Sequence, residues 1–304
     1  MYDIVIIGGG PAGMTAALYA RRNGKSALVL EKGGFGGQIT YSPRVQNFPG
    51  TLSMSGNEFA DKMLEQIMAQ GADVEVSAAT EIRSEGKTKR VLTEDGTEYE
   101  TKAVILAAGT RHRMLGLPGE TELVGSGISF CAVCDGEYYR GQTVAVAGGG
   151  NSALQEATLL AELCKEVILV QDLDYFTGEE KLSTALLQRP NVRAVTGTVI
   201  DSINTVKGSI RSLSLRRKAT GETSELDCDG LFVAIGLIPE NEAFKKVVPL
   251  NDYGYAAAGE NCETGTPGIF VAGDCRAKQV RQLTTAVADG AVAALAACRY
   301  IDAR

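Results

Sequence analysis

Two copies of one local pattern constrain the fold of this chain more than any other feature. Each copy is an apolar strand, a glycine-rich loop, a helix and a second apolar strand. The first copy spans strand 4–7, loop 8–13 and helix 14–22, and the second spans strand 143–147, loop 148–153 and helix 154–164. Uninterrupted apolar strands are typical of a parallel sheet that is buried on both faces. The sequence therefore predicts an α/β protein with two Rossmann-like, three-layer nucleotide-binding domains.

The two copies differ at the end of their second strand. In the first copy, strand 27–30 ends at Glu31, at the spacing from Gly8 where a dinucleotide fingerprint places its ribose-binding acid. The glycines of such a loop let backbone N–H groups approach a pyrophosphate at the helix N-terminus. In the second copy the corresponding position is Gln171. The first fingerprint is therefore complete, whereas the second lacks its acid.

Later segments indicate how the two domains are connected. Apolar strands at 103–106 and 268–272 each run into a glycine, and the second is followed by Asp274 and a small-residue helix at 284–300. A carboxylate and a helix N-terminus placed there can lie against a cofactor. Segments 116–119 and 236–239 resemble hinges, about which we expect the central domain to turn. We predict a discontinuous first domain of residues 1–115 and 240–304, with a second domain of residues 116–239 inserted in it.

A C-x-x-C pair, Cys131 and Cys134, lies just ahead of the second glycine loop and is followed by Asp135. Two cysteines at this spacing can close a disulfide and exchange it with a partner through a mixed disulfide. A C-x-x-C pair can also form half of a zinc site, but no second pair completes one and the only histidine is His112. We therefore expect no metal, and we interpret the pair as an electron relay from a cofactor to a disulfide substrate.

Composition narrows the partners and the cellular location. The net charge of −7 argues against nucleic acid or an anionic membrane as the main partner. No apolar run approaches the ~20 residues of a membrane span. The first residues already form a strand, so we expect no signal peptide, and seven cysteines form no secreted disulfide framework in a chain of 304 residues. A cytoplasmic location is expected.

Over essentially its full length, the chain resembles the low-molecular-weight, bacterial-type thioredoxin reductases. The resemblance rests on an ordered set of segments: 8–13, 36–38, 47–50, 107–110, 131–136, 148–153, 272–274, 281–282 and 288–290. It implies a homodimeric flavoprotein with FAD in the first domain, and thioredoxin or a similar small disulfide protein as partner. The residues it implies for FAD binding are Gly8, Gly10, Pro11, Ala12, Gly13, Glu31, Lys32, Gly36, Gly37, Gln38, Asn47, Ala108, Gly109, Gly273, Asp274, Arg281, Gln282 and Leu283.

The resemblance also implies a role for each residue of the redox segment. Cys134 would take electrons from reduced FAD, and Cys131 would attack the disulfide of the partner. Asp135 matches the acid that moves a proton to or from the flavin-side thiolate, which requires a raised pKa near neutrality. The alternative for Asp135 is a helix-cap or turn residue.

One segment departs from the family pattern. NADPH-dependent members follow the second strand of the second domain with a basic run that holds the 2′-phosphate, and here its three arginine positions are Asp172, Leu173 and Thr177. A phosphate would meet carboxylates where it needs bidentate arginine contacts, so we expect a donor other than NADPH.

Three interpretations of the electron donor stay open. The donor is a one-electron carrier such as ferredoxin, or it is NADH with Asp172 as a displaced ribose acid. Otherwise, the second cleft holds another nucleotide or nothing useful. A function of another class is a flavoprotein redox sensor, or an electron-transfer protein without efficient turnover.

The remaining cysteines separate into two groups. Cys164, Cys228 and Cys298 lie in apolar contexts and are expected to be small core residues. Cys275 follows Asp274, and Cys262 is near it in the sequence, so a second redox pair is an alternative there.

Overall fold

The computed structural model describes residues 1–42 and 44–303. The chain forms two compact units, Met1–Arg111 with Ile238–Arg304, and His112–Leu237. It passes between them through β7 (Thr110–His112) and β16 (Leu237–Pro239), which pair with each other. Pro43 and Arg304 fall inside the predicted first domain but lie outside the described residues. Each unit contains a parallel sheet with helices, so the predicted α/β class is confirmed.

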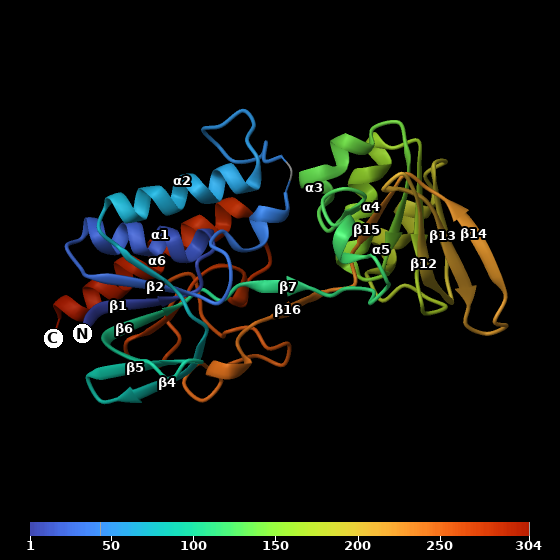
Figure 1. The fold of residues 1–304 in the computed structure, drawn as a ribbon. Coiled ribbons are helices and arrows are strands. Elements are labelled where there is room, and N and C mark those ends of the chain that lie inside the picture. The colour runs from blue at the N-terminus through green and yellow to red at the C-terminus, as the bar shows by residue number, and fades with distance from the viewer. Residues whose placement is uncertain (43, 304) are drawn as a thin grey trace. The chain divides into compact units, whose positions relative to one another are not determined.

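The first unit is built on one mixed sheet, of which Figure 1 labels β1, β2, β4, β5 and β6 in blue to green. Its strands are β1 (Tyr2–Ile7), β2 (Ala27–Glu31), β3 (Asp73–Val76), β4 (Ala79–Glu85), β5 (Thr88–Thr93), β6 (Glu98–Leu106) and β17 (Ile269–Val271). The order is β3-β2-β1-β6-β5-β4, and β17 pairs with the end of β6. The β4–β5 and β5–β6 pairs are antiparallel, whereas the pairs made by β1 and β2 are parallel.

Two cores lie on opposite faces of this sheet because successive strand residues point to opposite sides. Ile4 and Ile6 pack with α1 (Pro11–Arg22) and α6 (Leu283–Asp302), and α2 (Gly56–Ala69) covers the same face. Val5 and Ile7 pack on the other face, together with side chains from the segment around η4 (Glu242–Phe244). The last third of the chain thus completes both faces of the first unit.

The second unit repeats the strand, loop and helix pattern. Its parallel sheet has the order β11-β10-β9-β15-β8. These strands are β8 (Ile128–Ser129), β9 (Thr143–Ala147), β10 (Glu166–Val170), β11 (Val192–Val195) and β15 (Gly230–Val233). An antiparallel sheet of β12 (Thr198–Val206), β13 (Ser209–Arg217) and β14 (Thr223–Asp227) packs on one face.

Helices cover the other face of that parallel sheet. They are α3 (Ala132–Asp135), η3 (Gly136–Tyr139), α4 (Asn151–Leu163) and α5 (Glu180–Leu187). The core on this side joins the β9 residues Val144 and Val146 to Leu154 of α4 and to Ala132 of α3. The redox segment is therefore held by the core of the second unit. Among the helices of the described residues, none is long and apolar enough to cross a membrane.

Candidate active site

Two positions of the first glycine loop, Gly8 and Gly13, admit only glycine, because backbone atoms fill the space that a side chain would need. Gly8 has a φ of +110°, and a Cβ there would lie 2.2 Å from the carbonyl oxygen of Ala107. At Gly13 a Cβ would lie 1.8 Å from the carbonyl oxygen of Gly8. Pro11 begins α1, and Gly10 at the N-cap provides no side-chain cap. The first-turn N–H groups are left for a ligand, and a pyrophosphate fits such a helix N-terminus.

Glu31, at the end of β2, accepts a hydrogen bond from the backbone of this loop. Its Oε2 atom accepts the Gly9 N–H at 2.7 Å, and its Oε1 atom accepts the Gly33 N–H at 2.9 Å. The acid of the first fingerprint therefore lies beside the loop, where a ribose hydroxyl of a dinucleotide would be expected. The adjacent Lys32 pairs with Glu240 and is largely exposed.

Several predicted segments that are distant in the sequence meet at this loop. The Gly36 N–H donates to the Gly9 carbonyl at 2.9 Å. A Cβ on Gly37, which precedes Gln38 in η1 (Gly37–Tyr41), would lie 3.4 Å from the Cα of Gly10. A Cβ on Gly273 would lie 2.8 Å from that of Ala12. Ala108 and Gly109 follow directly on Ala107, which contacts Gly8. The fold thus brings these segments together around loop 8–13. We call the loop and these segments the cradle.

The segment after β17 adds polar groups to the same unit. Arg281 donates from Nε to the Asp274 carbonyl oxygen at 3.2 Å. Asn47 donates to the Gln282 side chain at 3.4 Å, and Gln282 is the N-cap of α6, which begins at Leu283. Asp274, Arg281, Gln282 and Asn47 are therefore neighbours.

Asp274 carries a buried carboxylate oxygen, Oδ1, that accepts no hydrogen bond among the described residues. Lys278 Nζ lies 3.2 Å from it as an ion pair and also 3.2 Å from Asp289. Burial raises the pKa of Asp274, and the charge of Lys278 opposes that rise. A buried acceptor with spare capacity suits a ligand hydroxyl. The sequence reasoning missed Lys278 and assigned Asp289 no contact. The sequence signal for these two residues was a lysine shortly before the small-residue helix and an acid within it.

The second glycine loop has the same backbone geometry but a different neighbour. Gly148 has a φ of +128°, and a Cβ there would lie 2.5 Å from the Ala234 carbonyl oxygen. Gln171 takes the position that Glu31 has in the first loop, is buried, and donates from Nε2 to the Tyr175 carbonyl at 3.2 Å. The Gly149 carbonyl accepts the N–H groups of Thr177 and Gly178, both at 2.9 Å. Backbone hydrogen bonds therefore hold the segment 171–178 against the second glycine loop.

A lysine that the sequence reasoning missed lies beside the altered segment. Lys218 Nζ is 3.4 Å from the Asp172 carboxylate, and both side chains are largely exposed. Its backbone N–H donates to the Gly197 carbonyl, and the Asp174 carboxylate packs against Gly197. This lysine is a point charge that already has an acidic partner. It does not restore the planar forks of arginine that bind a phosphate through two bonds.

The predicted redox pair is a disulfide in the structure. Cys131 and Cys134 are joined, with their Cα atoms 5.3 Å apart, and both residues are half-buried. Cys131 is the N-cap of α3, and the Cys134 N–H donates to its sulfur at 3.2 Å. Once the disulfide opens, this N–H would favour the thiolate form of Cys131. The geometry is therefore suited to a nucleophilic first cysteine.

Asp135 lies on the same short helix and is held by a serine that the sequence reasoning missed. Ser129, at the end of β8, donates to Asp135 Oδ2 at 2.6 Å, and the other oxygen, Oδ1, is buried without a hydrogen bond among the described residues. Burial raises the pKa of Asp135, and the bond from Ser129 lowers it by a smaller amount. The pKa is raised, as an acid that exchanges protons near neutrality requires.

Glu156 is a second acid at this segment that the sequence reasoning missed. It projects from α4 and accepts the backbone N–H of Ala132, the residue after Cys131. Burial raises its pKa to about 7. The hydrogen bond from the Ala132 N–H opposes this rise, and repulsion from Asp135 adds to it. The sequence signal was a carboxylate in the second turn of the helix that follows the glycine loop.

The other cysteines form no second redox pair among the described residues. Cys262 and Cys275 are buried free thiols, and burial raises their pKa values to about 11 and about 12. The structure therefore gives the alternative of a second pair no support. Cys164, Cys228 and Cys298 are buried, as expected of small core residues.

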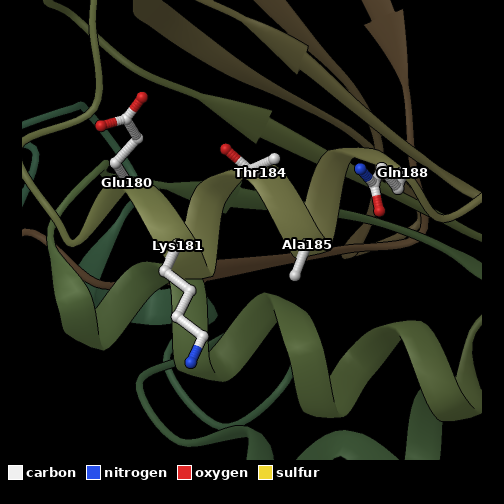
Figure 2. Close-up of a pocket in the computed structure, with 5 residues that line it drawn as sticks. All are labelled: Glu180, Lys181, Thr184, Ala185 and Gln188. Carbon is white, nitrogen blue, oxygen red and sulfur yellow. The ribbon is translucent and has the colours of Figure 1, made fainter.

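A hollow of about 410 Å³ lies along α5 and contains none of the predicted site residues. Figure 2 shows the side chains that line it: Glu180, Lys181, Thr184, Ala185 and Gln188. These side chains provide neither a thiol nor an acid near the redox segment. We therefore assign the hollow no part in the chemistry.

Comparison with known proteins identifies a family of oxidoreductases and several similar thioredoxin reductases. The family model for pyridine nucleotide-disulphide oxidoreductases matches residues 2–290. The chain is 37% identical over 302 residues to thioredoxin reductase of Bacillus subtilis, which covers 99% of this chain and 95% of the relative. It is 40% identical over 303 residues to a 34.2 kDa protein in a rubredoxin operon of Clostridium pasteurianum, with 99% and 98% covered. The crystal structure of thioredoxin reductase from Streptococcus pyogenes matches with a TM-score of 0.94 at 36% identity, covering 100% of this chain and 99% of that one.

Proposed function

The chain belongs to the pyridine nucleotide-disulphide oxidoreductase family, and from this premise we propose that it is an FAD-dependent reductase of thioredoxin or a similar small disulfide protein. The observation that carries the proposal is the disulfide between Cys131 and Cys134, with the half-buried acid Asp135 on the same helical turn. A disulfide held only for stability would need neither an adjacent acid of raised pKa nor an N–H that favours a thiolate.

The residues of the first unit that would hold FAD form two groups. The loop 8–13 and Glu31 would bind the dinucleotide part, and the Asp274 carboxylate with Arg281 and Gln282 would bind hydroxyl and ring atoms. The cradle fits such a group, because Gly10 at the N-cap of α1 has no side chain to cap the N–H groups of the first helical turn. FAD, when bound, supplies the two electrons that open the disulfide.

The reduced pair would then act by thiol–disulfide exchange. The Cys131 thiolate attacks one sulfur of the partner disulfide, so that a mixed disulfide forms and one partner thiolate leaves. Cys134 attacks the sulfur of Cys131, which restores the internal disulfide and releases the second partner thiolate. Of the two protons that end on the partner sulfurs, one is the proton that Cys134 loses and the other comes from water. Asp135 is placed to hold the proton that Cys134 loses before its attack.

We infer that the electron donor is a one-electron carrier such as ferredoxin rather than NADPH. Asp172 and Leu173 stand where the family needs arginine, and the nearby Lys218 is paired with Asp172. NADH is the second candidate, because Asp172 is a carboxylate near a loop that retains its glycine geometry. The Clostridium pasteurianum relative is described by its place in a rubredoxin operon, so rubredoxin is a further carrier to test.

The donor can be identified by anaerobic photometry of the FAD band. The protein is mixed separately with NADPH, NADH, reduced ferredoxin and reduced rubredoxin, and the rate of bleaching is followed. We expect a protein donor to bleach the band fastest. Rapid, saturable bleaching by NADPH would make this a pyridine-nucleotide-dependent reductase.

Turnover with thioredoxin distinguishes a reductase from a redox sensor. A reductase should reduce many equivalents of thioredoxin per chain with the identified donor. Reduction that stops after one equivalent would favour a sensor. We also propose, from the family likeness, a homodimer and a cytoplasmic location; light scattering on a sizing column tests the first.

A further inference from the structure

Glu156 directs its carboxyl group at the redox segment instead of at solvent. It lies in the second turn of α4, and its Oε2 atom accepts the N–H of Ala132, directly after Cys131. We propose that Glu156 is a positioning residue of the redox centre. It fixes the Cys131–Cys134 turn through that N–H and, with Asp135, holds a proton that moves when the disulfide opens and closes. This inference rests on the proposed function, in which the pair alternates between disulfide and dithiol.

The surroundings of Glu156 are unlike those of a structural carboxylate. A neutral acceptor would satisfy the single Ala132 N–H, whereas a buried carboxylate has a desolvation cost unless a cation offsets it. Asp274 in the first unit has such a cation, Lys278. Among the described residues, the charged group that acts on Glu156 is another acid, Asp135. Two acids without a cation, next to a pair of cysteines, favour a role in proton transfer.

The charged groups on the elements packed around α4 lie at the surface or stay neutral. Tyr139 on η3 remains protonated, because burial raises its pKa to about 12. Glu137, the exposed acid of η3, pairs with Arg140, which follows η3, and Glu166 of β10 pairs with Arg193 of β11. The start of α5 carries two further exposed charges, Glu180 and Lys181. None of these charged groups is among the groups that shift the pKa of Glu156.

Because Asp135 raises the pKa of Glu156, the two acids are expected to titrate as a coupled pair. Opening the disulfide takes two electrons and one proton, so one sulfur becomes a thiol and the other a thiolate. The new negative charge raises the proton affinity of the two acids, which take up a further proton from water. Closing the disulfide releases that proton again. Glu156 is the group whose pKa, at about 7, permits this exchange at neutral pH.

The test measures the reactivity of the Cys131 thiol against pH in the reduced holoprotein. Iodoacetamide alkylation of Cys131 is followed by peptide mass spectrometry over about pH 5 to 9, a range that spans the pKa of about 7 of Glu156 and the ordinary pKa of a thiol. We expect two steps in the wild type. Glu156→Gln keeps the acceptor for the Ala132 N–H but cannot ionise, so it should show one step, with its midpoint lowered by roughly 0.5 unit or more. Glu162→Gln, on an exposed part of the same helix, should match the wild type. A Glu156→Gln profile that superposes on the wild type overturns the proposal.

Two further measurements address positioning and folding. Glu156→Met removes the acceptor and should speed hydrogen exchange at the Ala132 N–H by about tenfold or more, whereas Glu156→Gln should keep the N–H protected. Unchanged protection in Glu156→Met would contradict the positioning role. In the unsubstituted protein, a ¹³C titration of the Glu156 carboxyl should give a midpoint that rises when the disulfide is reduced. A midpoint that does not move with redox state would overturn the proton role without relying on any variant.

These measurements use neither thioredoxin nor an electron donor. A protein that fails to reduce thioredoxin can still show the Glu156 step, in which case only the proposed function fails. A protein that reduces thioredoxin but shows no Glu156 step contradicts this inference alone.

Discussion

The hydroxyl group of Ser129 donates a 2.6 Å hydrogen bond to the carboxylate of Asp135. The same oxygen of Ser129 accepts the Cys131 N–H at 3.1 Å, so one side chain links the acid to the backbone of the first cysteine. Burial raises the pKa of Asp135, and this bond opposes the rise. Ser129 therefore limits how far the pKa of the acid departs from its ordinary value.

Replacing Ser129 by alanine should raise the pKa of Asp135 further. A bond to a charged acceptor contributes about 1.5 kcal/mol or more, which corresponds to a shift of roughly one pH unit. The pH profile of thioredoxin reduction should move upward by that amount, measured as kcat against pH. Ser126→Ala, at an exposed turn of the same unit, is the control. A downward shift of the pH profile would contradict the conclusion that the bond from Ser129 lowers the pKa of Asp135.

Replacing either cysteine of the pair should abolish thioredoxin reduction and leave FAD bound and reducible. The expected loss is about 10³-fold or greater, because both sulfurs are needed to complete one exchange. Only the Cys134→Ser variant, which retains Cys131, should trap a mixed disulfide with a thioredoxin that lacks its resolving cysteine. Cys164→Ala is the control, since that thiol is buried and its pKa is raised to about 11. An adduct formed by Cys134 instead would reverse the assigned order.

Gly13→Ala should remove FAD from a protein that otherwise purifies with about one FAD per chain. The added methyl would lie 1.8 Å from the Gly8 carbonyl oxygen, so the loop must move, at a cost of roughly 1–3 kcal/mol or more. The flavin absorbance per chain measures the loss. Gly34→Ala is a matched control, because nothing lies within 4 Å of a Cβ there. Full FAD occupancy in Gly13→Ala would show that this loop does not hold the cofactor.

Restoring arginine at Asp172, Leu173 and Thr177 should improve NADPH binding by about tenfold or more, since each arginine–phosphate contact is a charge-assisted bond. Binding is measured by calorimetry, with NADH as the comparison ligand. Asp172→Asn alone should give a smaller gain, because it frees Lys218 from its carboxylate partner. Equal gains in affinity for NADH and NADPH would mean that these positions do not recognise the 2′-phosphate.

His112 should make stability depend on pH in the acid range. It stacks on Phe130 with ring centroids 4.1 Å apart, and burial lowers its pKa to about 4. A base with a lowered pKa in the folded state stabilises the fold above its unfolded pKa of about 6.5, and that contribution is lost as pH falls toward 4. The difference in unfolding free energy between the wild type and His112→Phe should therefore change by about 3 kcal/mol between these limits. Urea unfolding at each pH measures it, and a constant difference would contradict the buried, neutral state.

The sequence determined both nucleotide folds, because their signals are local. The strand predicted at 143–147 is β9, and the apolar run at 4–7 forms the last four residues of β1. Strand and glycine-loop patterns are encoded by consecutive residues, so they can be read without knowledge of the packing. Both helices begin earlier than predicted, at Pro11 and Asn151, because the last residues of each glycine loop form the first helical turn.

The sequence by itself also placed Cys131, Cys134 and Asp135 on one segment, since they are adjacent along the chain. Only the tertiary structure brought Glu156 to Ala132, 24 residues away, and Lys218 to Asp172, 46 residues away. Such contacts depend on how α4 packs on α3 and how the antiparallel sheet lies against the parallel one, and no local pattern specifies either. Burial, which raises the pKa values of Asp135 and Glu156, is likewise a property of the packed core. The chain order therefore fixed which residues carry the thiol chemistry, and the packing decided which acids surround them.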